Sequence, residues 1–88
     1  MAGADSPELQ FPAPWRYRVV VEAGNPASPA LLRAVLDRYG IAAPLQEARC
    51  SGGGKYRSYH IDVLFESRAM MEALSRDLQA VDGVRFLL

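Results

Sequence analysis

The residues with the greatest capacity for chemistry lie in the middle of the chain: Cys50, His60 and Asp62. A thiol beside a histidine that a carboxylate orients is the arrangement of a nucleophilic catalyst. On a strand, His60 and Asp62 would share one face, and Cys50 would lie across a glycine turn. We favour a structural interpretation, because Cys50 continues the inward series of Ala48 and a lone strand histidine is usually structural. We therefore expect no catalytic residue, and with one histidine and one cysteine we expect no metal site and no cofactor.

The run Ser51-Gly52-Gly53-Gly54-Lys55 is superficially similar to a phosphate-binding loop. Such a loop is followed by a helix that supplies amide groups and a dipole, whereas here an alternating strand follows. The three glycines instead predict a hairpin turn, because glycine adopts positive φ without strain. Lys55, at the exit of this turn, is a candidate contact for a partner.

Charged side chains alternate along the predicted strands and would gather on one face of a sheet. The expected face carries Arg16, Arg18, Glu22, Glu47, Arg49, Asp62, Glu66 and Arg85 around Tyr56, Ser58 and His60. The arginines could bind a carboxylate or phosphate of a ligand or a docking partner. The alternative is a set of cross-strand ion pairs on a solvated face, and we favour it because charge is usual on an open antiparallel face.

An RNA-binding sheet needs aromatic side chains on its open face, where bases stack. Trp15, Tyr17, Tyr59 and Phe65 alternate toward the opposite face, which leaves Tyr56 as the one aromatic residue directed outward. RNA binding through the open face is therefore the alternative function rather than the leading one.

The elements that must position these residues follow from periodicity and from the breaks between the periodic segments. We predict a strand at 15–22, a helix capped by Ser28 that ends at Gly40, an edge strand at 44–51, a central strand at 55–66, a helix capped by Ser67 with an apolar stripe from Met70 to Val81, and a strand at 84–88. This order predicts an α+β, ferredoxin-like β-α-β-β-α-β fold, a four-stranded antiparallel sheet with two helices on one face. Residues 1–14 are expected to form a mobile tail, and residues 15–88 a single domain.

Composition narrows the function classes. The 88 residues carry ten basic and ten acidic side chains, so no net field draws the chain to nucleic acid or to a membrane. The single cysteine permits no internal disulfide, which fits a reducing cytoplasm. No apolar run is long enough to be a signal peptide or a membrane span.

Several short motifs occur together, in order and with consistent spacing. They are the run from Phe11 to Val19, Gly54-Lys55-Tyr56-Arg57-Ser58, Glu66-Ser67-Arg68, Ala73-Leu74 with Leu78, and the ending Val84-Arg85-Phe86-Leu87-Leu88. From about Leu9 to Leu88, the chain resembles the YbeD-like family of small bacterial proteins of unknown function. The family usually has a lysine and then, after two apolar residues, a glycine; here Arg18 keeps the charge, but Val21 replaces the glycine.

The resemblance implies a ferredoxin-like, ACT-domain-like fold, and some family members are encoded near genes of the lipoate pathway. By analogy with ACT domains, it implies a regulatory or adaptor module that binds a protein partner or a small metabolite. ACT-like folds hold small ligands beside the first strand-to-helix loop, which makes Gly24, Asn25 and Ser28 candidate contacts. The open edge of the strand at 44–51 is the expected place for pairing with a second copy.

Overall fold

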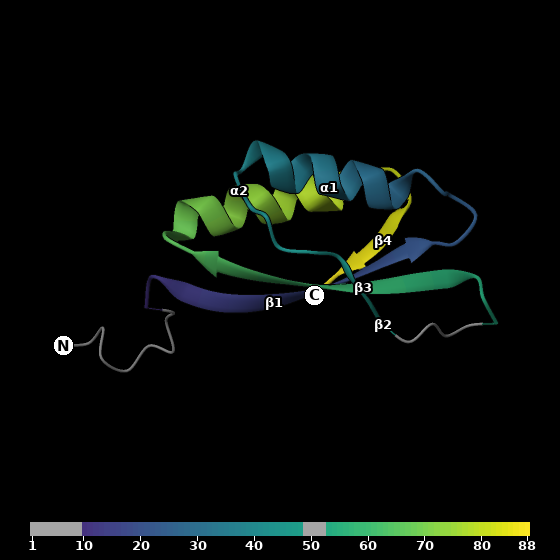
Figure 1. The fold of residues 1–88 in the computed structure, drawn as a ribbon, viewed down its shortest axis with the longest axis horizontal. Coiled ribbons are helices and arrows are strands. Elements are labelled where there is room, and N and C mark those ends of the chain that lie inside the picture. Colours follow the sequence, from purple (N-terminus) through teal and green to yellow (C-terminus); the bar gives the residue numbers. More distant parts are fainter. Residues whose placement is uncertain (1–9, 49–52) are drawn as a thin grey trace.

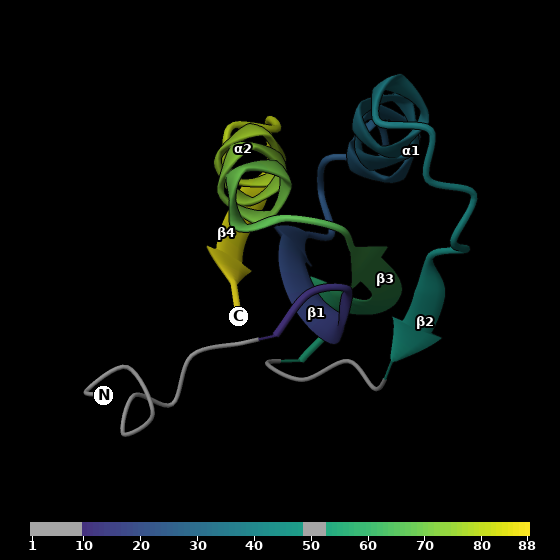
Figure 2. The same cartoon turned by 90° about the vertical axis from the view of Figure 1, so that its left-hand side faces the viewer.

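The computed structural model describes residues 10–48 and 53–88. Its elements are β1 (Ala13–Glu22), α1 (Ser28–Arg38), β2 (Gln46–Ala48), β3 (Tyr56–Phe65), α2 (Arg68–Gln79) and β4 (Val84–Leu87). The strands form one antiparallel sheet in the order β2-β3-β1-β4. Both helices cover the same face of this sheet, and the other face is left open (Figures 1 and 2). The predicted ferredoxin-like α+β fold is confirmed.

The core lies between the sheet and the helices. Alternate residues of the two central strands point into it, and the helices contribute residues at helical spacing. The buried side chains are Tyr17, Val19 and Val21 of β1, Tyr59, Ile61, Val63 and Phe65 of β3, Leu32, Val35 and Leu36 of α1, and Leu74 and Leu78 of α2. Tyr17 and Phe65 meet edge to face, with ring centroids 5.9 Å apart. The alternation predicted for both strands is confirmed at these positions.

The two helices begin differently. Ser67 caps α2 as predicted, because its hydroxyl accepts a hydrogen bond from the Met70 amide at 3.1 Å. The prediction that Ser28 caps α1 is wrong. The N-cap residue is Ala27, without a side-chain cap, and Ser28 is fully buried inside the first turn. Its hydroxyl instead donates to the carbonyl of Asp82 at 2.8 Å, so Ser28 fastens α1 to the turn before β4.

The strands differ from the prediction at their ends. β1 starts at Ala13, two residues before the predicted boundary, and β2 is only three residues long. Ala48 pairs with Ser58, which lies on the open face, so the inward position predicted for Ala48 is wrong. Cys50, Arg49 and most of the predicted tail lie outside the described residues.

Two connections have clear physical causes. Gly53 and Gly54 both have positive φ, which confirms the expected use of glycine at the turn into β3. The stretch from α1 to β2 is held by Arg33, whose guanidinium donates to the carbonyls of Ile41 and Ala43. No helix among the described residues is long and apolar enough to cross a membrane.

Candidate functional site

The open face of the sheet is organised in five cross-strand rows, because directly paired residues of antiparallel strands point to the same side. From one end to the other the rows are Leu64–Pro14, Asp62–Arg16, Gln46–His60–Arg18–Leu88, Ala48–Ser58–Val20–Phe86, and Tyr56–Glu22. Leu88 joins the third row through reciprocal backbone hydrogen bonds with Arg18, at 2.9 and 3.0 Å. The predicted face therefore brings together Arg16, Arg18, Tyr56 and His60.

An uncharged band, formed by Val20, Phe86 and Leu88, lies at the β4 side of this face in the third and fourth rows. Phe86 is 60% exposed and Leu88 is 68% exposed, while Val20 between the strands is partly buried. Ala48 and Ser58 continue the fourth row toward the β2 edge, where Ser58 is buried. Leu64, 58% exposed, lies separately at the far end of the face. The sequence predicted a solvated charged face, whereas the structure gives a face with exposed apolar side chains at its β4 side.

The prediction that Tyr56 is the one outward aromatic residue is wrong. Phe86 lies opposite Val20 on the open face, because the pairing of β1 with β4 shifts register between Val20 and Val21. Trp15 pairs with Val63 and so lies on the helix side of the sheet, as predicted. It is nevertheless 40% exposed and lies outside the buried core. It lines a shallow hollow of about 430 Å³ with Pro14, Leu64 and their neighbours.

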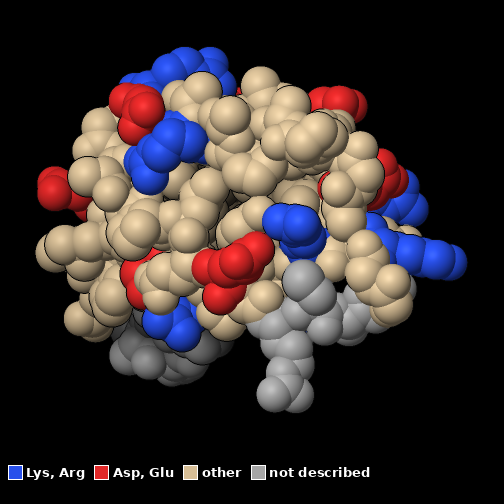
Figure 3. All heavy atoms as spheres, turned by 45° about the vertical axis from the view of Figure 1, so that its right-hand side comes forward, with Lys and Arg blue, Asp and Glu red and all other residues tan. Residues whose placement is uncertain are grey.

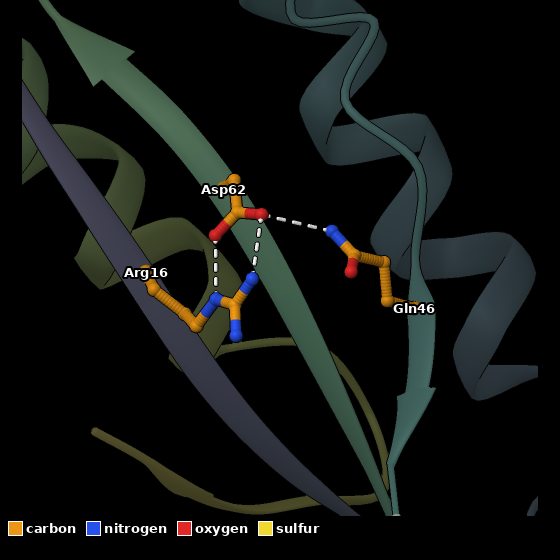
Figure 4. A network of polar contacts seen from close by, with 3 residues as sticks. All are labelled: Arg16, Gln46 and Asp62. Atoms are coloured by element: carbon orange, nitrogen blue, oxygen red, sulfur yellow. Dashed lines mark hydrogen bonds and ion pairs between the residues drawn. The ribbon is translucent and has the colours of Figure 1, made fainter.

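Asp62 is the centre of a polar network at the second row (Figure 4). Its carboxylate accepts two hydrogen bonds from Arg16, at 2.7 and 3.1 Å, and one from the Gln46 amide at 2.9 Å. These bonds favour the charged form and lower the pKa of Asp62 from 3.8 to about 2. The same contacts with Asp62 raise the pKa of Arg16. The Arg16 guanidinium therefore already binds a carboxylate of the same chain.

The remaining charges of the face do not balance. Arg85 pairs with Glu22 at 3.3 Å, as Arg16 pairs with Asp62. Arg18 has no ion pair or side-chain hydrogen bond with any described residue. The predicted place of Glu47 on this face is wrong, because Glu47 pairs with Tyr59 on the helix side and contacts Arg57 there. Arg18 is therefore the surplus cation among the described residues of the open face.

The loop after β1 is held by side-chain hydrogen bonds, both within the loop and to the turn before β4. Asn25 donates to the Asp82 carboxylate at 2.7 Å and accepts from the Ala27 amide at 3.2 Å. Ser28 is fully buried, so the structure removes it from the predicted ligand contacts. Gly24, Asn25, Lys55 and Tyr56 line an open depression of about 480 Å³ at this end of the sheet, which brings these four predicted residues together.

No catalytic geometry joins His60 to Asp62 within the described part of the chain. The carboxylate binds Arg16 and Gln46 rather than the imidazole, and His60 lies beside Arg18 and Gln46 in the next row. Among residues 10–48 and 53–88, no group of three or more His, Cys, Asp or Glu side chains could hold a metal ion. Figure 3 shows one side of the molecule, where small groups of both charges are separated by uncharged surface.

Comparison with known proteins places this geometry in context. Residues 6–88 match the family model described as a protein of unknown function (DUF493). The chain is 29% identical to a UPF0250 protein of Shewanella woodyi and 30% identical to those of Shewanella loihica and Vibrio parahaemolyticus. Each alignment spans 80 residues, which is 91% of this chain. The alignments cover 90%, 90% and 86% of those proteins.

Solved structures share the fold. The chain is similar to the solution structure of protein HP0495 from Helicobacter pylori, with a TM-score of 0.80 at 18% identity, covering 100% of this chain and 93% of that one. It is also similar to the C-terminal domain of the MgtC protein from Mycobacterium tuberculosis, with a TM-score of 0.64 at 17% identity, covering 85% and 82%. At such identities the likeness concerns the fold alone.

Proposed function

The chain belongs to the DUF493 family of proteins of unknown function, as its motifs indicate, and from that premise we propose that it is a small non-catalytic adaptor. It binds a protein partner through the open face of its sheet and acts in the reducing cytoplasm. The partner presents an apolar ridge with an acidic side chain beside it.

One observation carries this proposal: the band formed by Val20, Phe86 and Leu88 faces away from both helices. A side chain such as Phe86 gains free energy when a partner removes it from water. Aromatic residues at the centre of a patch, with charges at its rim, are typical of protein interfaces. Here Arg18, His60, Glu22 and Arg85 surround the band.

The surplus charge indicates what the partner offers. Arg18 adjoins Leu88 in the third row, and both acidic residues of the five rows, Glu22 and Asp62, are already paired with arginines. A carboxylate of the partner would accept a charge-assisted hydrogen bond from the Arg18 guanidinium. A second copy placed face to face would instead bring a second Arg18 and no unpaired side-chain carboxylate from these rows. The charge pattern therefore favours a different protein over self-association.

Docking on the face is also favoured over pairing at the β2 edge. β2 contains only Gln46, Glu47 and Ala48, so it offers few backbone groups to an added strand. Short edge strands are a common means by which proteins avoid such pairing.

RNA is the alternative ligand, and Tyr56 and Phe86 are the residues that favour it. They occupy different rows at opposite sides of the face, and Glu22 lies beside Tyr56. A carboxylate beside a stacking position opposes a phosphate backbone, so protein is the better fit.

The test is affinity capture with matched variants of the full chain, expressed in a native bacterial host. A true partner is retained by the unaltered chain and by Leu31→Ser, an exposed leucine on α1, and is depleted about tenfold or more by Phe86→Ser and by Arg18→Glu. Retention that is equal for all variants contradicts the proposal. Loss of the captured material on nuclease treatment, with a steep decrease as salt rises, assigns the face to RNA instead.

A further inference from the structure

A separate cavity of about 150 Å³ lies between the end of β1, the loop that follows it and the first turn of α1. Val21 and Tyr59, which line it, belong to the helix-covered face of the sheet. The cavity is therefore on the opposite side from the apolar band, and what it binds is independent of the proposed adaptor role.

The hydroxyl of Tyr59 is the first sign of a ligand site. Tyr59 is only 6% exposed, and its hydroxyl has no hydrogen-bond partner among residues 10–48 and 53–88. By contrast, the Tyr17 hydroxyl contacts Ser75 at 2.6 Å, and the Tyr39 hydroxyl donates to Asp77 at 2.5 Å. Tyr59 lines the cavity, so we take its hydroxyl as a donor to a molecule bound there.

The charges at the cavity favour an anion with a single charge. Arg57 lines it and faces Glu47 at 3.6 Å, an ion pair too long to count as a hydrogen bond, so the guanidinium donors remain available. Glu22 also lines the cavity, but its carboxylate is paired with Arg85. Arg57 can thus bind a carboxylate, and because it is the one cation among the described residues that line the cavity, an anion with a single charge is the better match.

The remaining wall is mixed. Asn25 lines it, but its side-chain amide already donates to Asp82 and accepts from the Ala27 amide. Val21, Pro26 and Pro29 supply carbon atoms, against which a short alkyl chain can pack. A volume of 150 Å³ equals about five water molecules in the liquid and lies below the range of about 300–1,000 Å³ for drug-sized ligands. The site is large enough for a small acid only.

We propose that this cavity binds a free short-chain monocarboxylic acid of about four or five carbons, a size taken from the cavity volume. Arg57 and Tyr59 donate to the carboxylate, and Val21, Pro26 and Pro29 enclose the alkyl chain.

The test is titration of the isotope-labelled full chain with sodium butyrate at constant ionic strength, followed by amide NMR. We expect saturable shifts centred on Val21, Ala23 and Tyr59. Arg57→Gln should weaken binding about tenfold or more, and Tyr59→Phe, which keeps the ring, about threefold, as expected for a charged and a neutral donor. Arg68→Gln, which removes an exposed cation on α2, should leave the affinity unchanged. So should Phe86→Ser, which tests independence from the open face.

Three results would overturn the proposal. The first is the absence of saturable shifts at butyrate concentrations of tens of millimolar, about tenfold above a weak millimolar affinity. The second is equal binding by butyramide or by the Arg57→Gln variant, because the carboxylate would then have no role. The third is tighter binding of inorganic phosphate or of 2-aminobutyrate, which would mean that a dianion is accepted or that Glu22 receives an ammonium group. Spectra of the free variants that match the original outside the cavity confirm that each one is folded.

Discussion

The Asp62 side chain connects β3 to both neighbouring strands, through Arg16 of β1 and Gln46 of β2, and its stabilising effect depends on pH. Arg16 and Gln46 hold the carboxylate in its charged form and lower its pKa to about 2, below the ordinary value of 3.8. A carboxyl group with a depressed pKa stabilises the folded state while it is ionised. This contribution is therefore complete above about pH 4 and is lost as the pH falls toward 2.

The loss of stability caused by replacing Asp62 with Asn should follow the same pH range. We expect Asp62→Asn to unfold at a lower urea concentration than the original chain at pH 7, with a small difference because the pair is exposed. The difference should disappear near pH 2. Glu66→Gln, at an exposed position that has no ion pair with any described residue, serves as the control. A difference for Asp62→Asn that persists unchanged at pH 2 would rule out the ion pair as its cause.

Gly83 is a position where only glycine fits. Its φ is +91°, and a Cβ there would lie 2.3 Å from the Ser28 hydroxyl oxygen and 2.9 Å from the Asn25 amide nitrogen. Gly83→Ala should lower the free energy of unfolding by about 1–3 kcal/mol, from backbone strain and steric overlap together. Urea denaturation measures this effect. Gly40→Ala shares the positive φ without a close contact, so it should cost less; an equal cost would show that the overlap with Ser28 contributes nothing.

At the scale of elements, α2 depends on its cap more than α1 does. Ser67 accepts from the Met70 amide, whereas α1 has no side-chain cap. Ser67→Ala should destabilise the chain by about 1 kcal/mol, and Ser67→Asp should retain most of the stability because its carboxylate accepts the same bond. Thermal unfolding followed by circular dichroism compares the two variants. If both lose stability equally, the cap bond is not the source of the effect.

The elements also show how far the sequence could predict the site. Alternation in β1 and β3 correctly placed Tyr17, Val19, Tyr59 and Phe65 toward the helices, because a side-chain period of two leaves no choice once one face is buried. It also gathered Arg16, Arg18 and His60 on the open face. These predictions needed only local pattern.

The remaining features arise from pairing between distant segments. The short β4 has too few residues for a clear alternation, and a register shift against β1 sets Phe86 outward. Likewise, β2 is too short to define its own faces, so the sides of Glu47 and Ala48 follow only from their pairing with β3. Ser28 is a typical capping residue in sequence. Only its contact with Asp82 shows that its buried hydroxyl connects α1 to the turn before β4. No local signal could have revealed these three arrangements.

At the scale of the whole molecule, the two faces of the sheet have separate roles. One face is covered by the helices and builds the core (Figure 2). The other face presents Phe86 and Leu88 beside Arg18, which has no ion pair with any described residue. The side chains of Phe86 and Leu88 contribute little to the stability of the fold while they are exposed to water. The proposed binding of a protein partner on that face accounts for the band and for an Arg18 side chain that pairs with no described residue.

The most direct test of this central claim is photo-crosslinking in living cells, with a photoreactive phenylalanine analogue in place of Phe86 in one variant and of Leu31 in another. Both positions are exposed, but only Phe86 lies on the open face. We predict a crosslinked product between position 86 and a different protein, absent from position 31 and reduced by Arg18→Glu in the same chain. Equal products from both positions, or a product at 86 that contains only RNA or a second copy of this chain, would contradict the account.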